Sequence, residues 1–430
     1  MKASVLILTS LILFVSTAVA ERKSWSEIVD RYLDVDVELA AAKSTLDAAE
    51  SSLKLAYTSA LPSVEFVQSV ADQKVAAARG GAVINFPSTI HEANIQFSQP
   101  IFLGGQVWTA VNIAENSRDA QKMSYLASRR LSVQRILNLT LEYLAEIERL
   151  KVIRDSEKVQ EEFLRLTGQR KKRGNARSYE LEQARSELYA YGPRRLASEQ
   201  AVDTWLHQLR QQLDWGEFTG VTQPRLSFPA FQRPQDLDQY AASVLAQRPD
   251  LVQARMTVDA TKLNRTLEHQ SFYPSVDLTG QIGYLGSEFG SLYESQNEQR
   301  TVSLNLTIPL NTFSHVYTRQ EQKDEVLAAE RNYRVRVRQL KIDVYQAARR
   351  LETAQLSLVQ SQRWASSAKK ALKAGQSDYR SGVIDNLQVV QLQVASERAQ
   401  LGEIDARLLL QQNWLNWLYL TNGDLKQFYQ

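Results

Sequence analysis

The fold is decided by the stretch Val302-Ser303-Leu304-Asn305-Leu306-Thr307-Ile308 and by the proline-free region that follows Pro309. Every second residue of the stretch is apolar, which is the period of a β-strand with one apolar and one polar face. In the proline-free region, apolar residues recur at heptad spacing on both sides of Gly382, and glycine commonly ends a helix. The sequence therefore predicts a strand followed by two antiparallel helices, each about 60–100 Å long at 1.5 Å per residue.

Two apolar seams define these helices. The first seam consists of Val337, Leu340, Val344, Ala347, Leu351, Ala354, Leu358, Ala365, Ala368 and Leu372. The second consists of Leu387, Val390, Val394, Leu401, Ile404, Leu408, Leu415 and Leu418. Small residues in the seams allow close packing, and polar faces flank them on both sides. Helices from several chains could then close into a hollow cylinder or form a solid coiled-coil rod, and the seams do not distinguish the two.

The order helix, strand, loop, strand, long helix, glycine turn, long helix occurs twice. Three pairs of landmarks share an offset of about 210 residues, which indicates a tandem duplication: Pro62 and Pro274, Pro100 and Pro309, Gly174 and Gly382. We expect a first repeat at 21–236, with strands within 62–103 and a turn near 174. The second repeat would occupy 237–430, with strands within 274–310 and a turn near 382. Residues 72–92 contain Gly80-Gly81 and Pro87, and are expected to form a loop.

Composition narrows the class of protein. The 430 residues are 43% hydrophobic, and 51 basic residues nearly balance 48 acidic ones, so the net charge of +3 argues against a nucleic-acid partner. There is no cysteine, which excludes disulfides, thiolate metal sites and a lipidated N-terminal cysteine. Residues 1–20 resemble a secretory signal peptide, with Lys2, an apolar run and the small-residue site Ala18-Val19-Ala20.

After residue 20 no apolar run is long enough for a membrane helix, so a membrane protein would have to use its strands. Four strands are too few to close a barrel, and open edges are not tolerated in lipid. Strands from three chains would give a twelve-stranded barrel. Its lumen would be lined by Gln96, Ser98, Asp277, Thr279, Gln281, Asn305 and Thr307. Its lipid face would carry Ile95, Phe97, Val276, Leu278, Leu304 and Leu306. The alternative is a small soluble sheet packed on the chain's own helices.

Several motifs, in this order along the chain, resemble the TolC-like outer-membrane efflux proteins. The resemblance covers residues 21–423. The motifs are Gln99-Pro100-Ile101-Phe102 followed by Gly104-Gly105, Arg248-Pro249-Asp250-Leu251 before Tyr273-Pro274-Ser275, Ile308-Pro309-Leu310, and Tyr379-Arg380-Ser381-Gly382. The resemblance implies a mostly helical chain with a small β part. It also implies a homotrimer in the outer membrane, with a twelve-stranded barrel continued by a hollow helical tunnel in the periplasm.

The resemblance further implies a duct of a tripartite efflux or type I secretion system. The helical turns would meet a periplasmic adaptor protein, which links the duct to an inner-membrane transporter. The implied docking residues are Arg170, Arg173, Gly174, Asn175, Arg177, Gly382, Val383 and Asp385. The implied gate residues at the second turn are Asp378, Tyr379, Arg380, Gln388 and Gln391. Family members often carry acids where Gln388 and Gln391 stand, so an acidic ring at the entrance is in doubt.

The run Arg170-Lys171-Lys172-Arg173, with Arg177, is unusually basic for a helix end. Cations complement the dipole at the C-terminus of a helix, so the run has a purely structural explanation. The functional explanation is docking to an acidic surface of the adaptor.

No catalytic, cofactor or metal-binding pattern is found. The four histidines, at 91, 207, 269 and 315, are scattered, and there is no phosphate-binding loop. We therefore expect no enzyme and no cofactor. The alternative to a duct is a secreted trimeric coiled-coil protein with a structural or interaction role.

Overall fold

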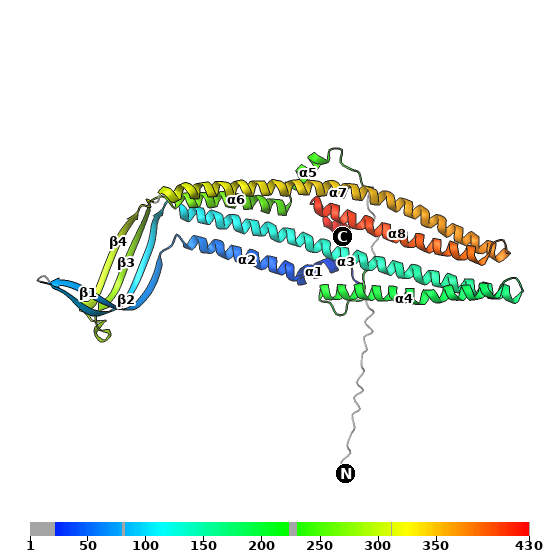
Figure 1. The fold of residues 1–430 in the computed structure, drawn as a ribbon, viewed down its shortest axis with the longest axis horizontal. Helices are drawn as coiled ribbons and strands as arrows, with labels where there is room; N and C mark the ends of the chain where they lie inside the picture. Colours follow the sequence, from blue (N-terminus) through cyan, green and yellow to red (C-terminus); the bar gives the residue numbers. More distant parts are fainter. Residues whose placement is uncertain (1–21, 80–81, 223–229, 311, 430) are drawn as a thin grey trace, which may run out of the picture. The chain divides into compact units, whose positions relative to one another are not determined.

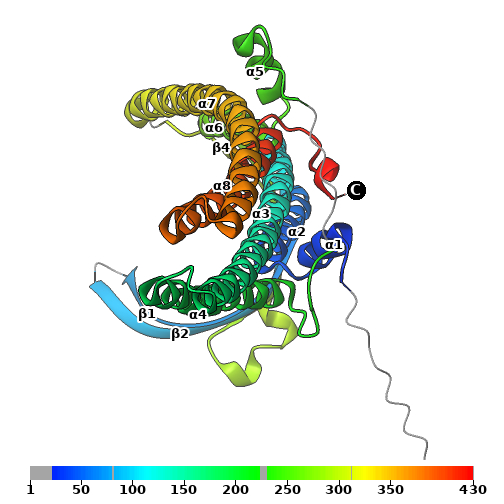
Figure 2. The ribbon, with the colours of Figure 1, turned by 90° about the vertical axis from the view of Figure 1, so that its right-hand side faces the viewer.

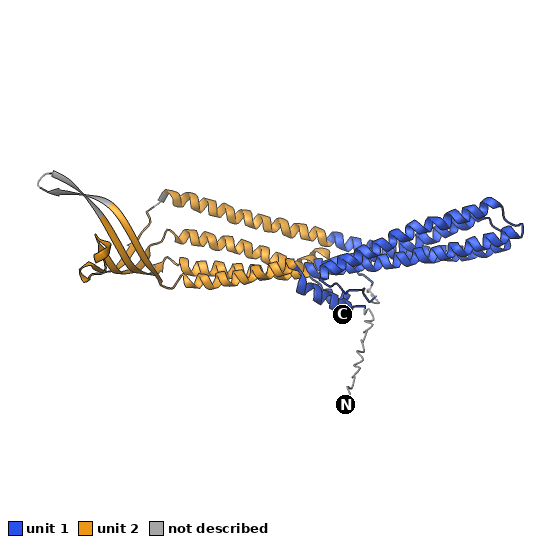
Figure 3. Cartoon of the chain, turned by 90° about the horizontal axis from the view of Figure 1, so that it is seen from below, with its two compact units in different colours: residues 1–36, 131–235, 345–430 blue, residues 37–130, 236–344 orange. Residues whose placement is uncertain are grey.

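The computed structural model describes residues 22–79, 82–222, 230–310 and 312–429, with the backbone alone for 73–79, 82–88 and 312. The predicted signal peptide at 1–20 lies outside these residues. The chain divides into two compact units (Figure 3). Unit 1 comprises residues up to Asp36, Leu131–Gln235 and Tyr345–Gln430, and unit 2 comprises Val37–Arg130 and Asp236–Val344. Each unit combines segments from both predicted repeats, because compactness follows spatial contact rather than sequence order. The repeat boundary at 236 stays a prediction.

The chain is mostly helical, with one four-stranded sheet (Figure 1). The helices are α1 Trp25–Val35, α2 Val37–Thr58, α3 Gln106–Lys172, α4 Ser178–Leu213, α5 Leu237–Leu245, α6 Pro249–Gln270, α7 Thr312–Ser381 and α8 Asn386–Leu420. The strands are β1 Ser63–Arg79, β2 Ala82–Leu103, β3 Ser275–Gly286 and β4 Glu298–Thr307. Among the described residues, no helix carries an apolar stretch sufficient to cross a lipid bilayer.

The sheet, in unit 2, has the order β1-β2-β3-β4, and all neighbouring strands are antiparallel. Its register aligns residues of one kind across all four strands. One polar row is Glu65, Gln96, Gln281, Thr301, and the adjacent row is Val64, Phe97, Gly280, Val302. Because side chains alternate between faces along a strand, one face of the sheet is polar and the other apolar. The two faces predicted from the sequence are confirmed.

Residues 72–92, expected to form a loop, are instead largely strand. β1 and β2 pair without interruption from Ser63 with Ser98 to Arg79 with Ala82. Pro87 is tolerated in β2 because pairing with β3 begins only at His91, so the missing N–H of Pro87 leaves no ladder bond to β3 unmade. The prediction was wrong because a proline interrupts a strand only where its missing N–H would have bonded to a neighbouring strand, and at Pro87 the strand β2 has a partner on one side only.

The apolar face of the sheet is uncovered within the chain. Val302 is 80% exposed, Leu304 69% and Phe66 66%. A small sheet packed on the chain's own helices would bury these side chains, so that alternative is wrong. Exposed apolar area of this size is expected to be covered by lipid or by another chain.

The long helices follow the heptad seams for most of their length. α7 has 70 residues and α8 has 35, or about 105 Å and 52 Å, so α8 is shorter than expected. Val344, Leu351 and Leu415 are buried as predicted. Leu387 and Val394 are 51% and 44% exposed, so these two predicted seam residues are not in the core of a single chain. Local heptad spacing cannot tell which seam residue faces the same chain and which faces solvent.

Gly104, in the turn between β2 and α3, gives a test of the fold of unit 2. Its φ is +61°, and a Cβ there would lie 2.6 Å from Tyr273 Cβ and 3.0 Å from the Gln270 carbonyl oxygen. Gly104→Ala is expected to lower the free energy of unfolding by about 2–4 kcal/mol, because strain of the left-handed backbone adds to steric overlap.

The measurement is the thermal midpoint followed by circular dichroism. Gly290→Ala is the matched control, because no atom lies within 4 Å of a Cβ built there and its φ is not in the left-handed region. Equal midpoints for the two variants would contradict the close packing of the β2–α3 turn on α6.

Candidate functional site

The first helical turn, in unit 1, joins α3 to α4 through residues 173–177. Gly174 has φ +79°, which only glycine adopts without strain. The Asn175 N–H reaches back to the Arg170 carbonyl at 2.9 Å, and so completes a regular helix end. Arg173, Gly174, Asn175 and Arg177 are all exposed, as are Lys171 and Lys172. The turn therefore presents a dense positive charge to solvent.

The second turn, also in unit 1, joins α7 to α8 and repeats this geometry. Gly382 has φ +84°, and the Val383 N–H donates to the Asp378 carbonyl at 2.8 Å. Asp385 accepts the Gln388 N–H at 2.9 Å, and the Gln388 side chain accepts the Asp385 N–H at 3.2 Å. This reciprocal pair is a capping box, which stabilises the start of α8. Gln388 thus has a local structural role that its predicted place in a gate did not anticipate.

The two hairpins are held together by Tyr379, which is only 1% exposed. Its hydroxyl lies 3.0 Å from the Thr167 hydroxyl, and its ring centroid lies 5.0 Å from that of Phe163. Arg170 donates to the Tyr379 carbonyl and places its guanidinium 4.3 Å from the ring centroid. Phe163, Thr167 and Arg170 belong to α3, so Tyr379 joins the end of α7 to the end of α3. Cation–π contact and hydrogen bonds together fix this junction.

The other predicted gate residues lie beside this junction. Asp378, Arg380 and Gln391 are exposed. Arg380 borders a hollow of about 220 Å³ together with Glu162 and Tyr379. The pKa of Glu162 is lowered, chiefly by its hydrogen bond with Arg165, and the charge of Arg380 adds to this effect. Tyr379 is therefore the one buried member of the predicted gate set, and Arg380 faces the solvent.

A polar seam on α8 was missed by the sequence analysis. Its amides are buried, and each donates to the other hairpin: Asn386 to the Gln183 side chain at 3.0 Å, and Gln393 to the Ser156 carbonyl at 3.2 Å. Farther along α8, Arg407 donates to Glu148 at 2.9 Å. The spacing of 386, 393 and 407 is a multiple of seven, a signal that a search for polar heptads would have found.

Glu397 is the charged member of this interface and is 4% exposed. It accepts the Tyr191 hydroxyl at 2.7 Å and pairs with Arg194. Burial raises the pKa of Tyr191 well above its ordinary value, and the hydrogen bond to the Glu397 carboxylate raises it further. A buried carboxylate needs such partners, because an unpaired charge in the interior is costly. The interface between the hairpins therefore combines these matched polar pairs with a buried apolar cluster of Phe163, Ala184, Tyr379, Val389 and Val390.

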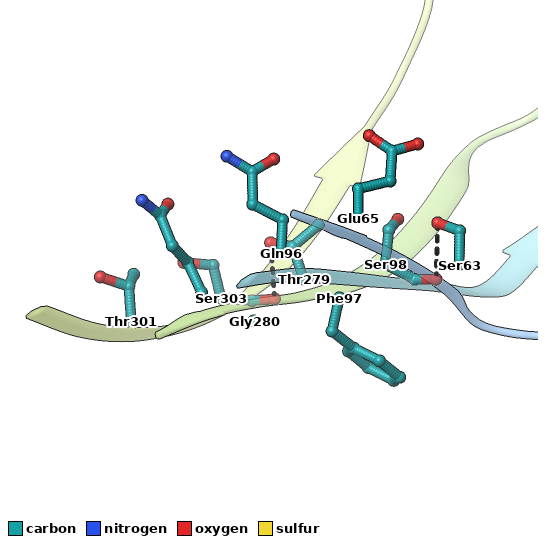
Figure 4. Close-up of a pocket in the computed structure, with 10 residues that line it drawn as sticks. Ser63, Glu65, Gln96, Phe97, Ser98, Thr279, Gly280, Thr301 and Ser303 are labelled. Carbon is teal, nitrogen blue, oxygen red and sulfur yellow. Dashed lines mark hydrogen bonds between the residues drawn. The ribbon is translucent and has the colours of Figure 1, made fainter. Parts of the chain in front are cut away.

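Besides the helical turns and the junction, the second candidate region is the polar face of the sheet, in unit 2 (Figure 4). A shallow hollow of about 280 Å³ is lined by side chains from all four strands. In Figure 4, Glu65, Gln96, Thr301 and Ser303 point to one side of the strands and Phe97 points to the other. The Gln281 amide donates to Glu92 at 2.9 Å. This face can contact water and polar solutes.

In the part of the chain that the structure describes, no three His, Asp or Glu side chains come together to hold a metal ion. His269 and His315 are neighbours, with ring centroids 5.7 Å apart. The pKa of His269 is lowered by burial and by the positive charges of Arg319 and Arg265, so the environment opposes a cation there. The candidate functional features are therefore the two helical turns, the junction at Tyr379 and the two faces of the sheet.

Comparison with known proteins identifies the family of proteins to which a chain with these features belongs. The sequence pattern that defines the outer membrane efflux proteins matches residues 28–213 and 241–423. The chain belongs to the outer membrane efflux protein family. The family, the outer-membrane location and the role as an efflux duct, all predicted from the motifs, are confirmed.

Two relatives of this efflux protein are consistent with the family assignment. The pyoverdine export outer membrane protein OpmQ of Pseudomonas putida is 23% identical over 419 residues, which cover 92% of this chain and 86% of OpmQ. The fusaric acid resistance protein FusA of Burkholderia cepacia is 32% identical over 150 residues, 34% of this chain and 28% of FusA. The chain therefore spans less than a third of FusA in that match.

Solved structures share the fold of this efflux protein. The CmeC outer membrane channel of Campylobacter jejuni has a TM-score of 0.79 at 18% identity, covering 93% of this chain and 85% of CmeC. The MtrE outer membrane channel of Neisseria gonorrhoeae, solved in its open state, has a TM-score of 0.73 at 18% identity, covering 95% and 91%.

The junction between the hairpins can be tested with Tyr379→Phe. The variant keeps the ring and loses the hydroxyl, so the bond to Thr167 disappears while Thr167 still donates to the Phe163 carbonyl at 3.0 Å. A buried hydrogen bond is worth about 1 kcal/mol, so backbone amides in the last two turns of α7 are expected to exchange roughly fivefold faster with deuterium. Tyr189→Phe on α4 is the control, because Tyr189 is 69% exposed. Equal protection in both variants would argue against Tyr379 as the link.

Proposed function

We propose that this protein is the outer-membrane exit duct of a tripartite efflux or type I secretion system. It would pass substrates from a periplasmic adaptor and an inner-membrane transporter to the exterior. The observation that carries the proposal is the sheet, whose one face is polar, whose other face is apolar and exposed, and whose register aligns both faces across four strands. A surface with these two sides fits a wall between water and lipid.

We propose further that three copies assemble. Within the described ranges, β1 and β4 each pair on one side only, so the sheet has two open edges. Unpaired backbone groups in a bilayer cost several kcal/mol each, and pairing of β4 with β1 of the next copy removes that cost. Three copies of four strands give the twelve-stranded barrel expected from the sequence. The exposed seam residues Leu387 and Val394 supply surface for contacts between neighbouring copies in a hollow helical tunnel in the periplasm.

We infer that the chain arose by tandem duplication, with repeats at 21–236 and 237–430. Two features support this. The family pattern matches two separate segments, 28–213 and 241–423. Each half also contributes one antiparallel strand pair, one glycine turn with φ near +80° and one long helical hairpin.

The helical turns are proposed to dock the adaptor, and the junction behind them to act as the gate. Docking is supported by the exposure of Lys171, Lys172 and Arg173. Gating is supported by Tyr379, because this one residue joins the end of α7 to the end of α3 through Thr167 and Arg170, beside a small apolar cluster. Arg380, exposed beside Tyr379, would act on the gate through Glu162 rather than through a buried bond.

The proposed assembly has a direct test. The protein should leave membranes only in detergent, have the mass of a trimer there, and conduct ions in planar lipid bilayers. The Tyr379→Phe variant should conduct more than the wild type, because the bond from the end of α7 to Thr167 is lost. A monomer that is soluble without detergent would instead support the secreted structural protein, and a trimer without conductance would support a solid rod.

Docking is tested by reversing the charge of the first turn. Lys171, Lys172 and Arg173 are changed to Glu, and Arg170 is kept because it contacts Tyr379. Binding of the purified adaptor is expected to weaken about tenfold at roughly 0.05 M salt, with a much smaller difference near 1 M, because exposed charges are screened. Glu substitutions at Lys369, Lys370 and Lys373 of α7 are the matched control, since these lysines are equally exposed but lie away from both turns. If both triple variants lose the same affinity, net charge rather than the first turn is responsible.

A further inference from the structure

We propose that the polar face of the sheet makes the duct prefer cations over anions. The inference rests on the proposed function, because it needs this face to line a water-filled lumen. It is carried by the fixed charges on that face. The register assigns each side chain of the described strands to one face, so the charges can be counted face by face.

The described side chains of the polar face include three carboxylates, Glu65, Glu92 and Asp277, and no Lys or Arg. Their neighbours on this face are largely amides and hydroxyls, such as Gln96, Thr279 and Ser303, which carry no charge. The apolar face differs, because its charges are mixed: Asp72, Glu298 and Arg300, with Arg300 paired to Glu298. The described charges sum to −3 on the polar face and −1 on the apolar face, so the negative charge is concentrated on the polar face.

The three carboxylates are spread along the strands rather than gathered in one place. Asp277 pairs with Pro100, Glu65 with Gln96, and Glu92 lies four residues farther along β2. At about 3.3 Å per residue the three levels span roughly 26 Å. An ion passing along this face would remain near a fixed negative charge for that whole distance. Three copies of the chain would place three carboxylates at each level.

The size of the effect follows from screening. A twelve-stranded barrel with strands about 4.8 Å apart and tilted about 40° has a radius of roughly 12 Å. The Debye length is about 30 Å at 0.01 M salt and about 3 Å at 1 M. The fields of the carboxylates therefore overlap across the whole lumen at low salt and stay close to the wall at high salt. The preference should be strong in dilute salt and nearly absent in concentrated salt.

The helical turns do not supply such a charge. Gln388 and Gln391 are neutral, and the carboxylates of Asp378 and Asp385 at the second turn are outnumbered by the cations of the two turns, Lys171, Lys172, Arg173 and Arg380. A cation preference would therefore be assigned to the sheet and not to the turns. The solutes favoured at the exit would be cationic, or zwitterionic with an exposed cation.

The test is the ratio of K⁺ to Cl⁻ permeability, obtained from reversal potentials of the full-length protein in neutral-lipid bilayers. The wild type is expected to give a ratio of at least about three near 0.01 M KCl and a ratio near one at 1 M. The triple variant Glu65→Gln, Glu92→Gln, Asp277→Asn should bring the low-salt ratio close to one. The control Asp72→Asn, Glu298→Gln neutralises carboxylates on the opposite face and should leave the ratio unchanged.

Thr301→Lys adds one cation to the polar face at an exposed position of β4, and should lower the low-salt ratio even if the triple variant fails to assemble. A conducting wild type whose ratio is the same in Thr301→Lys and in the triple variant would overturn this inference and leave the proposed duct standing. A wild type that assembles without conducting would overturn the proposed duct itself. The two failures are therefore distinguishable.

Discussion

The backbone groups at the two open edges of the sheet are the constraint on which the rest depends. A strand at an edge leaves half of its N–H and C=O groups without a partner. In lipid these groups cannot form hydrogen bonds with water instead. The chain has four amphipathic strands with one apolar, exposed face. A sheet of this kind is stable in a membrane only when its edges meet those of other copies. The proposed assembly would thus satisfy the hydrogen bonding of β1 and β4 before any side chain is considered.

The long helices are constrained by the burial of their apolar surface. A helix of 70 residues has far more surface than one partner can cover, so α7 divides its apolar residues between a buried seam and exposed positions. Where the two hairpins of unit 1 meet, an apolar cluster around Phe163 and Val389 is accompanied by polar contacts. Asn386, Gln393 and Glu397 are buried and hydrogen-bonded to partners on α3 or α4. The polar contacts can separate at low cost because water replaces the lost hydrogen bonds, whereas separation of the apolar cluster exposes its side chains to water. The polar contacts are therefore the part of this interface that the proposed gate would break at least cost.

The surfaces proposed to act on cargo or partner share one physical character. The turns present charge, the polar face presents charge of the opposite sign, and the junction at Tyr379 controls how firmly the hairpins are joined. All three properties are electrostatic or hydrogen-bonded, and all three respond to salt or to a partner's charge. The export energy would come from the transporter, which agrees with a chain that belongs to a family of efflux proteins.

The sequence by itself determined the features that depend on local periodicity. Alternation placed Gln96, Thr279 and Leu304 on the correct faces, and heptads with Gly174 and Gly382 placed the long helices and their turns. The tertiary structure alone decided that β1 and β2 continue through Pro87, that Leu387 and Val394 are exposed, and that Tyr379 contacts Thr167. The physical reason is the separation along the sequence between the residues that determine each feature. A period is fixed by neighbours a few residues apart, whereas the partner of a side chain more than two hundred residues away depends on how whole elements pack.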